Sequence, residues 1–288
     1  MKWKMDNTRA VRRPAVAGMF YPAEKETLAR DIRSMLETVS VPRITGTISG
    51  LVTPHAGYMY SGRVAAAGYA VLEGKNYDTV VVISPSHREA FSGVSIYEGE
   101  AYSTPLGTIP VDTALREALV AENTLLFTSS AGHHAEHAVE VQLPFLQIVL
   151  GDFKLLPAVM GDQTLQTCEA FADALSTYVK PDSCLVVASS DLSHYYPQSR
   201  ALELDSVAAR DIEAFDPYQF MADVAASRTE ACGAGPVAAA MLACRKLGAD
   251  HARVIARCTS GDVSGDTSAV VGYLSALFWK NNTGANRG

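Results

Sequence analysis

The sequence predicts an α/β fold in three layers, with a mostly parallel or mixed central sheet that carries helices on both faces. Three observations lead to this prediction. Short β-branched runs alternate with longer amphipathic stretches along the chain. Several of the short runs, such as residues 80–83, are continuously apolar, as in strands covered on both faces. The 288 residues are 48% hydrophobic and 19% charged, which is enough for a large buried core and excludes an intrinsically disordered chain.

The strands are expected where β-branched runs are bounded by turn residues, at 47–53, 79–84, 153–160, 185–189, 252–259 and 269–276. The helices are expected where apolar side chains recur at helical spacing, at 24–39, 61–73, 113–121, 135–149, 164–179, 198–214, 217–225 and 235–247. Residues 93–97 and 101–109 predict an antiparallel excursion with turn residues at Glu98-Gly99 and Pro105-Leu106-Gly107. We place this excursion as an insertion at the edge of the sheet.

The chain contains no Pro/Gly/Ser-rich linker, charge block or repeat, so we expect one domain over residues 13–279. A basic N-terminal arm, 1–12, precedes it, and a flexible tail, 280–288, follows. The arm has no apolar region behind it, unlike a secretory signal, and the apolar runs are far shorter than the roughly 20 residues needed to cross a bilayer. The five cysteines form no CxxC pair. These features predict a cytoplasmic protein with no membrane partner.

Charge and motifs exclude other classes of function. A net charge of -7 repels a polyphosphate, so nucleic acid is not an expected partner. No strand is followed by GxGxxG or by GxxxxGK[ST], and we therefore expect no nucleotide cofactor. The GxSxG elbow of the α/β-hydrolases is absent as well.

The informative polar residues follow the expected strands. His55 follows the first strand, His87 follows the second, and Asp191 and His194 follow the fourth. Ligands of open α/β sheets bind outside the carboxyl ends of the strands, so these loops are expected to share a crevice. Two further polar segments, 133–140 and 230–236, bring the number of histidines in such segments to six of seven. A single histidine at a strand end is commonly a hydrogen-bonding residue, whereas this number together favours a shared site.

His55 and His87 are the best candidate metal ligands in the sequence. Neutral imidazole suits iron, copper, nickel and zinc, and two imidazoles with one anion leave coordination positions open for chemistry. Spacing does not identify the third ligand. Cys232 lies just before an expected helix N-terminus, which lowers a thiol pKa, and this position suits either a thiol nucleophile or a metal thiolate.

The segment 133–140 also has alternatives. His133 and His137 would lie one helical turn apart and could form a zinc pair, but the first histidine is not followed by the glutamate that a metalloprotease helix requires. Glu140 would either orient the imidazole of His137 or lie on a solvated helix face.

Six motifs together resemble the MEMO family, in its prokaryotic branch described as protein B of the AmmeMemoRadiSam system. The resemblance extends from about residue 12 to 279. The motifs are Arg13-Pro-Ala-Val-Ala-Gly-Met-Phe-Tyr21-Pro22, Pro54-His55-Ala-Gly-Tyr58 with Ser61-Gly62, Ser84-Pro-Ser-His87, Glu136-His137-Ala-Val-Glu140-Val-Gln-Leu-Pro144-Phe145, Ser189-Ser-Asp191-Leu-Ser-His194 and Cys232-Gly233.

This resemblance implies a fold like that of the class III extradiol dioxygenases, in which two histidines and a glutamate hold non-haem Fe(II). His55 and His87 match the ligand histidines, and Cys232 matches the cysteine at the third ligand position. His194 matches the acid/base histidine. The resemblance also places Asp191 and His137 in the crevice, Asp191 as a catalytic residue. With His137, we expect Tyr58 and Glu140 to orient ligands or contact substrate.

The implied function is that of a mononuclear redox enzyme with iron (Fe2+) as the metal and copper as the second choice. A thiolate keeps the single charge of a carboxylate but is softer and itself oxidisable, which argues against catechol cleavage. The alternatives are a non-catalytic module that binds a peptide or metal in the same crevice, and a thiol or zinc hydrolase. The implied partners are a small-molecule substrate or peptide, a radical-SAM protein and an AMMECR-type protein.

Overall fold

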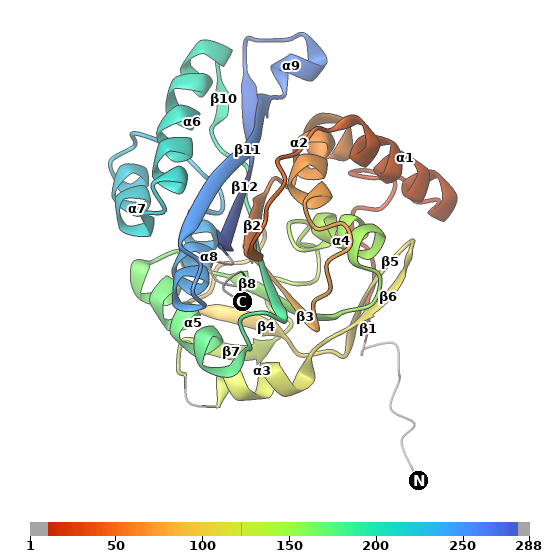
Figure 1. Ribbon diagram of the computed structural model, residues 1–288, viewed down its shortest axis with the longest axis vertical. Coiled ribbons are helices and arrows are strands. Elements are labelled where there is room, and N and C mark those ends of the chain that lie inside the picture. Colours follow the sequence, from red (N-terminus) through yellow and green to blue (C-terminus); the bar gives the residue numbers. More distant parts are fainter. Residues whose placement is uncertain (1–10, 122, 282–288) are drawn as a thin grey trace, which may run out of the picture.

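The computed structural model describes residues 11–121 and 123–281, and within them it contains a nine-stranded mixed sheet and a second sheet of three strands (Figure 1). The strands are β1 (Val11–Arg12), β2 (Thr47–Thr53), β3 (Thr79–Pro85), β4 (Val94–Tyr97), β5 (Ala101–Thr104), β6 (Gly107–Pro110), β7 (Leu126–Ser129), β8 (Lys154–Met160), β9 (Cys184–Ser189), β10 (His194–Tyr196), β11 (His251–Thr259) and β12 (Val270–Lys280). The helices are α1 (Lys25–Thr38), α2 (Tyr58–Ala70), α3 (Thr113–Val120), the 3₁₀ helix η2 (Glu140–Gln142), α4 (Leu143–Leu150), α5 (Leu165–Tyr178), α6 (Gln198–Glu213), α7 (Pro217–Ala225), α8 (Ala234–Lys246) and α9 (Gly261–Ser264).

The large sheet has a parallel centre and antiparallel flanks. Its order is β10-β12-β2-β9-β3-β8-β4-β7, with β11 paired to β12. The four central strands β2, β9, β3 and β8 run parallel, so their carboxyl ends meet at one edge. The strands β10, β11 and β12 pair antiparallel on one side, and β4 pairs antiparallel with β8 on the other. The predicted mixed sheet is therefore confirmed.

Helices cover both faces of this sheet, as predicted. Helices α1, α2 and α4 pack on one face, while α5 and α8 pack on the other (Figure 1). Helix α8 approaches the strands closely because its buried residues are mostly alanine and glycine. A Cβ at Gly50 of β2 would lie 2.5 Å from Cys244 Sγ of α8, so this contact requires glycine. The close packing fixes the start of α8 against the carboxyl ends of the strands.

The predicted edge insertion is wrong for its first strand. β4 lies inside the large sheet between β8 and β7, because it pairs with both. β5 and β6 do pair antiparallel across the predicted turn at Pro105-Leu106-Gly107, but with β1 they make the small separate sheet, and β4 does not pair with β5.

The helix predicted at residues 135–149 begins later, which overturns the zinc pair. Residues 133–139 form turns, η2 and α4 follow, and Pro144 occupies the first turn of α4. The carboxylate of Glu136 accepts the backbone N–H groups of His137 and Ala138, which holds a turn where a helix was expected. His133 points away from His137 into the core between Tyr102 and Ser95.

The N-terminal boundary also differs in detail from the expected arm. Arg12 is buried in the fold, while residues 1–10 of the expected arm lie outside the described residues. At the other end, Lys280 is the last residue of β12, and residues 282–288 of the expected tail lie outside the described part. Across the described ranges, every helix is too short or too polar to span a bilayer.

Candidate metal centre

The histidines that follow the parallel strands meet at the carboxyl edge of the sheet. His55 lies in the loop after β2 and His87 in the loop after β3, and their ring centroids are 5.1 Å apart. Cys232 comes from a distant segment, just before α8, and its Sγ lies 3.2 Å from Nε2 of His55. One ligand atom from each of these three residues lies within 4.8 Å of the other two. The three predicted ligands therefore form one group.

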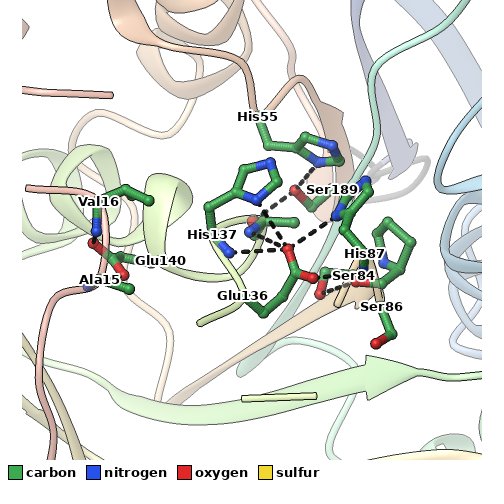
Figure 2. Close-up of polar contacts among 12 residues, drawn as sticks. Ala15, Val16, His55, Ser84, Ser86, His87, Glu136, His137, Glu140 and Ser189 are labelled. Atoms are coloured by element: carbon green, nitrogen blue, oxygen red, sulfur yellow. Dashed lines mark hydrogen bonds and ion pairs between the residues drawn. The ribbon is translucent and has the colours of Figure 1, made fainter. Parts of the chain in front are cut away.

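Both histidines are held by their Nδ1 atoms. The ring of His55 is buried, and its Nδ1 lies 2.8 Å from the hydroxyl of Ser189 at the end of β9. Nδ1 of His87 lies 3.0 Å from Oε1 of Glu136 (Figure 2). The opposite nitrogen of each ring, Nε2, is the one left for a metal, as is usual where a second partner orients a ligand histidine. Burial, reinforced by the neighbouring histidines, holds the pKa of His55 well below 6.5, so its imidazole is neutral.

Glu136 is a functional residue that the sequence did not single out. Its Oε1 contacts Nδ1 of both His87 and His137, and the same oxygen accepts the backbone N–H groups of His137 and Ala138 (Figure 2). Its Oε2 accepts the backbone N–H of His87 at 2.6 Å. Burial alone would raise the pKa of Glu136, but the bonds from His137 and His87 outweigh burial and lower it.

His87, Glu136 and His137 form a second group with ligand-like spacing. Oε1 of Glu136 is already occupied by four donors, and Oε2 accepts the backbone N–H of His87, so the carboxylate is largely engaged by these two histidines and the Ala138 N–H. We conclude that this group orients imidazoles. His137 completes a triangle of rings, 5.2 Å from His55 and 4.8 Å from His87.

Cys232 is fixed by its backbone on both sides. Its N–H donates to the carbonyl of Asp191, and Asp191 N–H donates to Sγ at 3.3 Å. Nε2 of Gln163 donates to the Cys232 carbonyl at 2.8 Å, and Oε1 of Gln163 accepts from Gly235 N–H. A Cβ at Gly233 would lie 2.4 Å from the carbonyl oxygen of Ser189, so only glycine allows this approach.

The pKa of Cys232 moves in the direction opposite to the one expected from its place before a helix. Burial, together with the charge of Asp191, raises it to about 12. The metal-free thiol is therefore protonated at neutral pH, which disfavours a free thiolate nucleophile. A bound cation would stabilise the thiolate instead.

Asp191 contacts the segments that carry two of the candidate ligands. Its Oδ1 accepts the backbone N–H of His55 at 2.8 Å, and its N–H donates to Sγ of Cys232, so this residue joins the His55 loop to the Cys232 turn. Burial raises the pKa of Asp191. His194 begins β10, three residues after Asp191, and is half-buried.

Glu140 and Tyr58 have partners away from the metal ligands. Glu140 is fully buried, and it accepts the N–H groups of Ala15 and Val16 (Figure 2). It also binds Arg12 and the hydroxyl of Tyr21. The carboxylate that orients His137 is thus that of Glu136, four residues before Glu140 in the sequence. The hydroxyl of Tyr58 donates to the carbonyl of Val141 at 2.7 Å, inside the core.

The fold and the site together define an α/β protein with a histidine and cysteine cluster at the carboxyl edge of its sheet. Comparison with known proteins gives the family: the description "Memo-like protein" matches residues 12–277, and the chain belongs to this family.

Relatives and a solved structure agree with this family and fold. The MEMO1 family proteins of Methanobrevibacter smithii and Thermotoga maritima are 38% and 36% identical to the chain, and each alignment covers 93% of this chain and 99% of the relative. The one of Nitrosopumilus maritimus is 34% identical with the same coverage. The crystal structure of the uncharacterized protein JW3007 from Escherichia coli K12 matches with a TM-score of 0.52 at 14% identity, over 80% of this chain and 99% of that one. This likeness concerns the fold alone.

Proposed function

We propose that the chain is a mononuclear metal-dependent oxidoreductase in which His55, His87 and Cys232 hold iron, with copper as the second metal. One observation carries the proposal: donors from three distant segments lie within 4.8 Å of one another. The donor set fits these metals, because imidazole binds both and a thiolate favours Cu(I) and iron over hard cations. Two imidazoles and one thiolate also leave coordination positions free.

The chain's own residues have separate tasks in this proposal. A bound redox metal would supply electron transfer and open positions for O2 or substrate. Cys232 carries the single negative charge of the ligand set, and Ser189 and Glu136 keep Nε2 of the two histidines available. His194 transfers a proton to or from the substrate through its imidazole. Asp191 holds the His55 loop and the Cys232 turn together.

The substrate class and the partners belong to the same proposal. The substrate is a small molecule or a peptide that enters beside His87, whose side chain is 30% exposed. A radical-SAM protein and an AMMECR-type protein are the proposed functional partners, and the cytoplasm is the proposed location. The alternative is a non-catalytic module that binds metal or peptide in the same place, and the oxidisable thiol in the ligand set favours it.

The first experiment is elemental analysis of protein purified without oxygen, before and after reconstitution with Fe2+ or Cu(I). Wild type is expected to hold about one metal per chain, and His55→Ala, His87→Ala and Cys232→Ala are expected to lose it. His251→Ala is the matched control, since this histidine is half-exposed and pairs with Asp250 at the surface. Redox assays with phenolic substrates and reductants then follow. Reconstituted wild type without metal would refute the proposal, and stoichiometric metal without turnover would favour the binding module.

A further inference from the structure

We propose that Ser189, held by Gln142, is a positioning residue that fixes His55 as its Nδ1–H tautomer and so directs the lone pair of Nε2 at the ligand group. The inference rests on the proposed function only in assigning that lone pair to a metal. All three residues are buried: Gln142 and Ser189 are 0% exposed and His55 is 2% exposed. Their hydrogen bonds are therefore made to one another and to the protein.

The orientation of the Gln142 amide is determined by a carbonyl group. Nε2 of Gln142 lies 3.0 Å from the carbonyl oxygen of Pro54, which can only accept, so this end of the amide must be the nitrogen. Oε1 accordingly accepts the hydroxyl groups of Thr53 at 2.9 Å and Tyr69 at 2.8 Å. The second N–H of Gln142 donates to Oγ of Ser189 at 2.7 Å.

The Ser189 hydroxyl donates its proton to a backbone carbonyl group. The carbonyl oxygen of Ala138 lies 2.7 Å from Oγ and can only accept, so Ser189 donates its one proton there. A hydroxyl has one donor and two lone pairs, and Gln142 occupies one of the lone pairs. The other faces Nδ1 of His55 at 2.8 Å and can only accept from it.

The tautomer of His55 follows from this chain of assignments. With Nδ1–H donating to Ser189, the neutral ring keeps its lone pair on Nε2, 3.2 Å from Sγ of Cys232. In the other tautomer, two buried acceptors would face each other across 2.8 Å without a proton. The penalty for such an unsatisfied contact corresponds to a preference of about 10- to 100-fold for the Nδ1–H form.

The test is ¹⁵N NMR of histidine-labelled, metal-free protein, in which ring nitrogens with and without a proton have distinct shifts. His55 of the wild type is expected to be protonated on Nδ1, and in Ser189→Ala the population is expected to move toward Nε2–H. Zn2+, a diamagnetic probe, is expected to bind Ser189→Ala about 10- to 100-fold more weakly. Ser275→Ala is the matched control, since it removes a buried serine hydroxyl that donates to the carbonyl of Val64, outside the Gln142 chain, and both readouts should stay as in wild type.

Two results would overturn the inference: a wild-type His55 protonated on Nε2, or a Ser189→Ala protein whose His55 tautomer is unchanged. The wild-type spectrum alone decides the first point, even if the variant does not fold. A wild type that shows the Nδ1–H form and fails to bind Zn2+, Fe2+ or Cu(I) would refute the proposed function while supporting the tautomer assignment.

Discussion

Metal binding by this chain is expected to strengthen with pH, by about tenfold for each unit between about pH 7 and 9. Burial and the charge of Asp191 raise the pKa of Cys232 to about 12, so only about one thiol in 100,000 is ionised at pH 7. A metal held by the thiolate must therefore displace one proton from the thiol. His55 releases no proton, because burial keeps its pKa well below 6.5 and its imidazole is already neutral. The thiol thus contributes about one proton to the slope.

The assay is titration with Co2+ against a competing chelator at several pH values, followed by the thiolate-to-cobalt absorption band and corrected for protonation of the chelator. Cys232→Ser is expected to bind weakly and to lose the absorption band together with most of the pH slope. Cys258→Ser is the matched control: this thiol lies in β11, belongs to neither ligand group, and should leave the slope unchanged. An affinity that does not change from about pH 7 to 9 would refute this account of Cys232.

Three further predictions concern buried groups. Burial lowers the pKa of His133 to about 3 in the folded chain. As pH falls below 6.5, this histidine is protonated in the unfolded chain before the folded one, so up to about 5 kcal/mol of stability is lost between pH 6.5 and about 3. In urea unfolding, His133→Gln should therefore show a flatter dependence of stability on pH. Glu140→Gln leaves the buried Arg12 without its counter-charge and is expected to cost about 3–5 kcal/mol, measured by urea unfolding; an unchanged midpoint would show that the pair is dispensable. Glu136→Gln removes the charge that orients His87 and His137, so the Co2+ affinity should fall about 10- to 100-fold. Glu98→Gln, a control at the surface, should leave the Co2+ affinity unchanged.

The strands of the sheet centre could be predicted because their signal is local. β2 has the predicted bounds, and β3, β8 and β9 begin or end within one residue of theirs, since continuous apolar runs mark strands covered on both faces. The place of β4 could not be predicted, because strand order depends on pairing with β8 and β7, which lie more than 25 residues away along the chain. The short strands β7 and β10 lack a periodic pattern of their own and were missed.

The candidate ligands could be proposed from the sequence more fully than the residues that hold them. His55 and His87 stand directly after parallel strands, where side chains gather at one edge. Cys232 was assigned as the third ligand from the family resemblance, because its position before α8 does not indicate which strand ends lie near it. The sequence gives one weak indication of the residues that hold His55: a glutamine, Gln142, lies between the apolar residues Val141 and Leu143. A polar side chain buried at such a place must find partners, and here they come from three other segments, at residues 53–54, 69 and 189.

The two glutamates of one segment show how the fold and the site depend on each other. Glu136 orients two imidazoles, and Glu140 holds the N-terminal segment through Arg12, Ala15 and Val16. That segment leads to Phe20, whose ring lies 4.8 Å from the ring of His137 and whose carbonyl accepts the N–H of Tyr58, three residues after His55. Phe20 thus contacts both histidine loops, and the hydrogen bonds of Glu140 hold the segment that leads to it. The N-terminal segment is therefore part of the wall of the site, although no residue of it belongs to the candidate ligand groups.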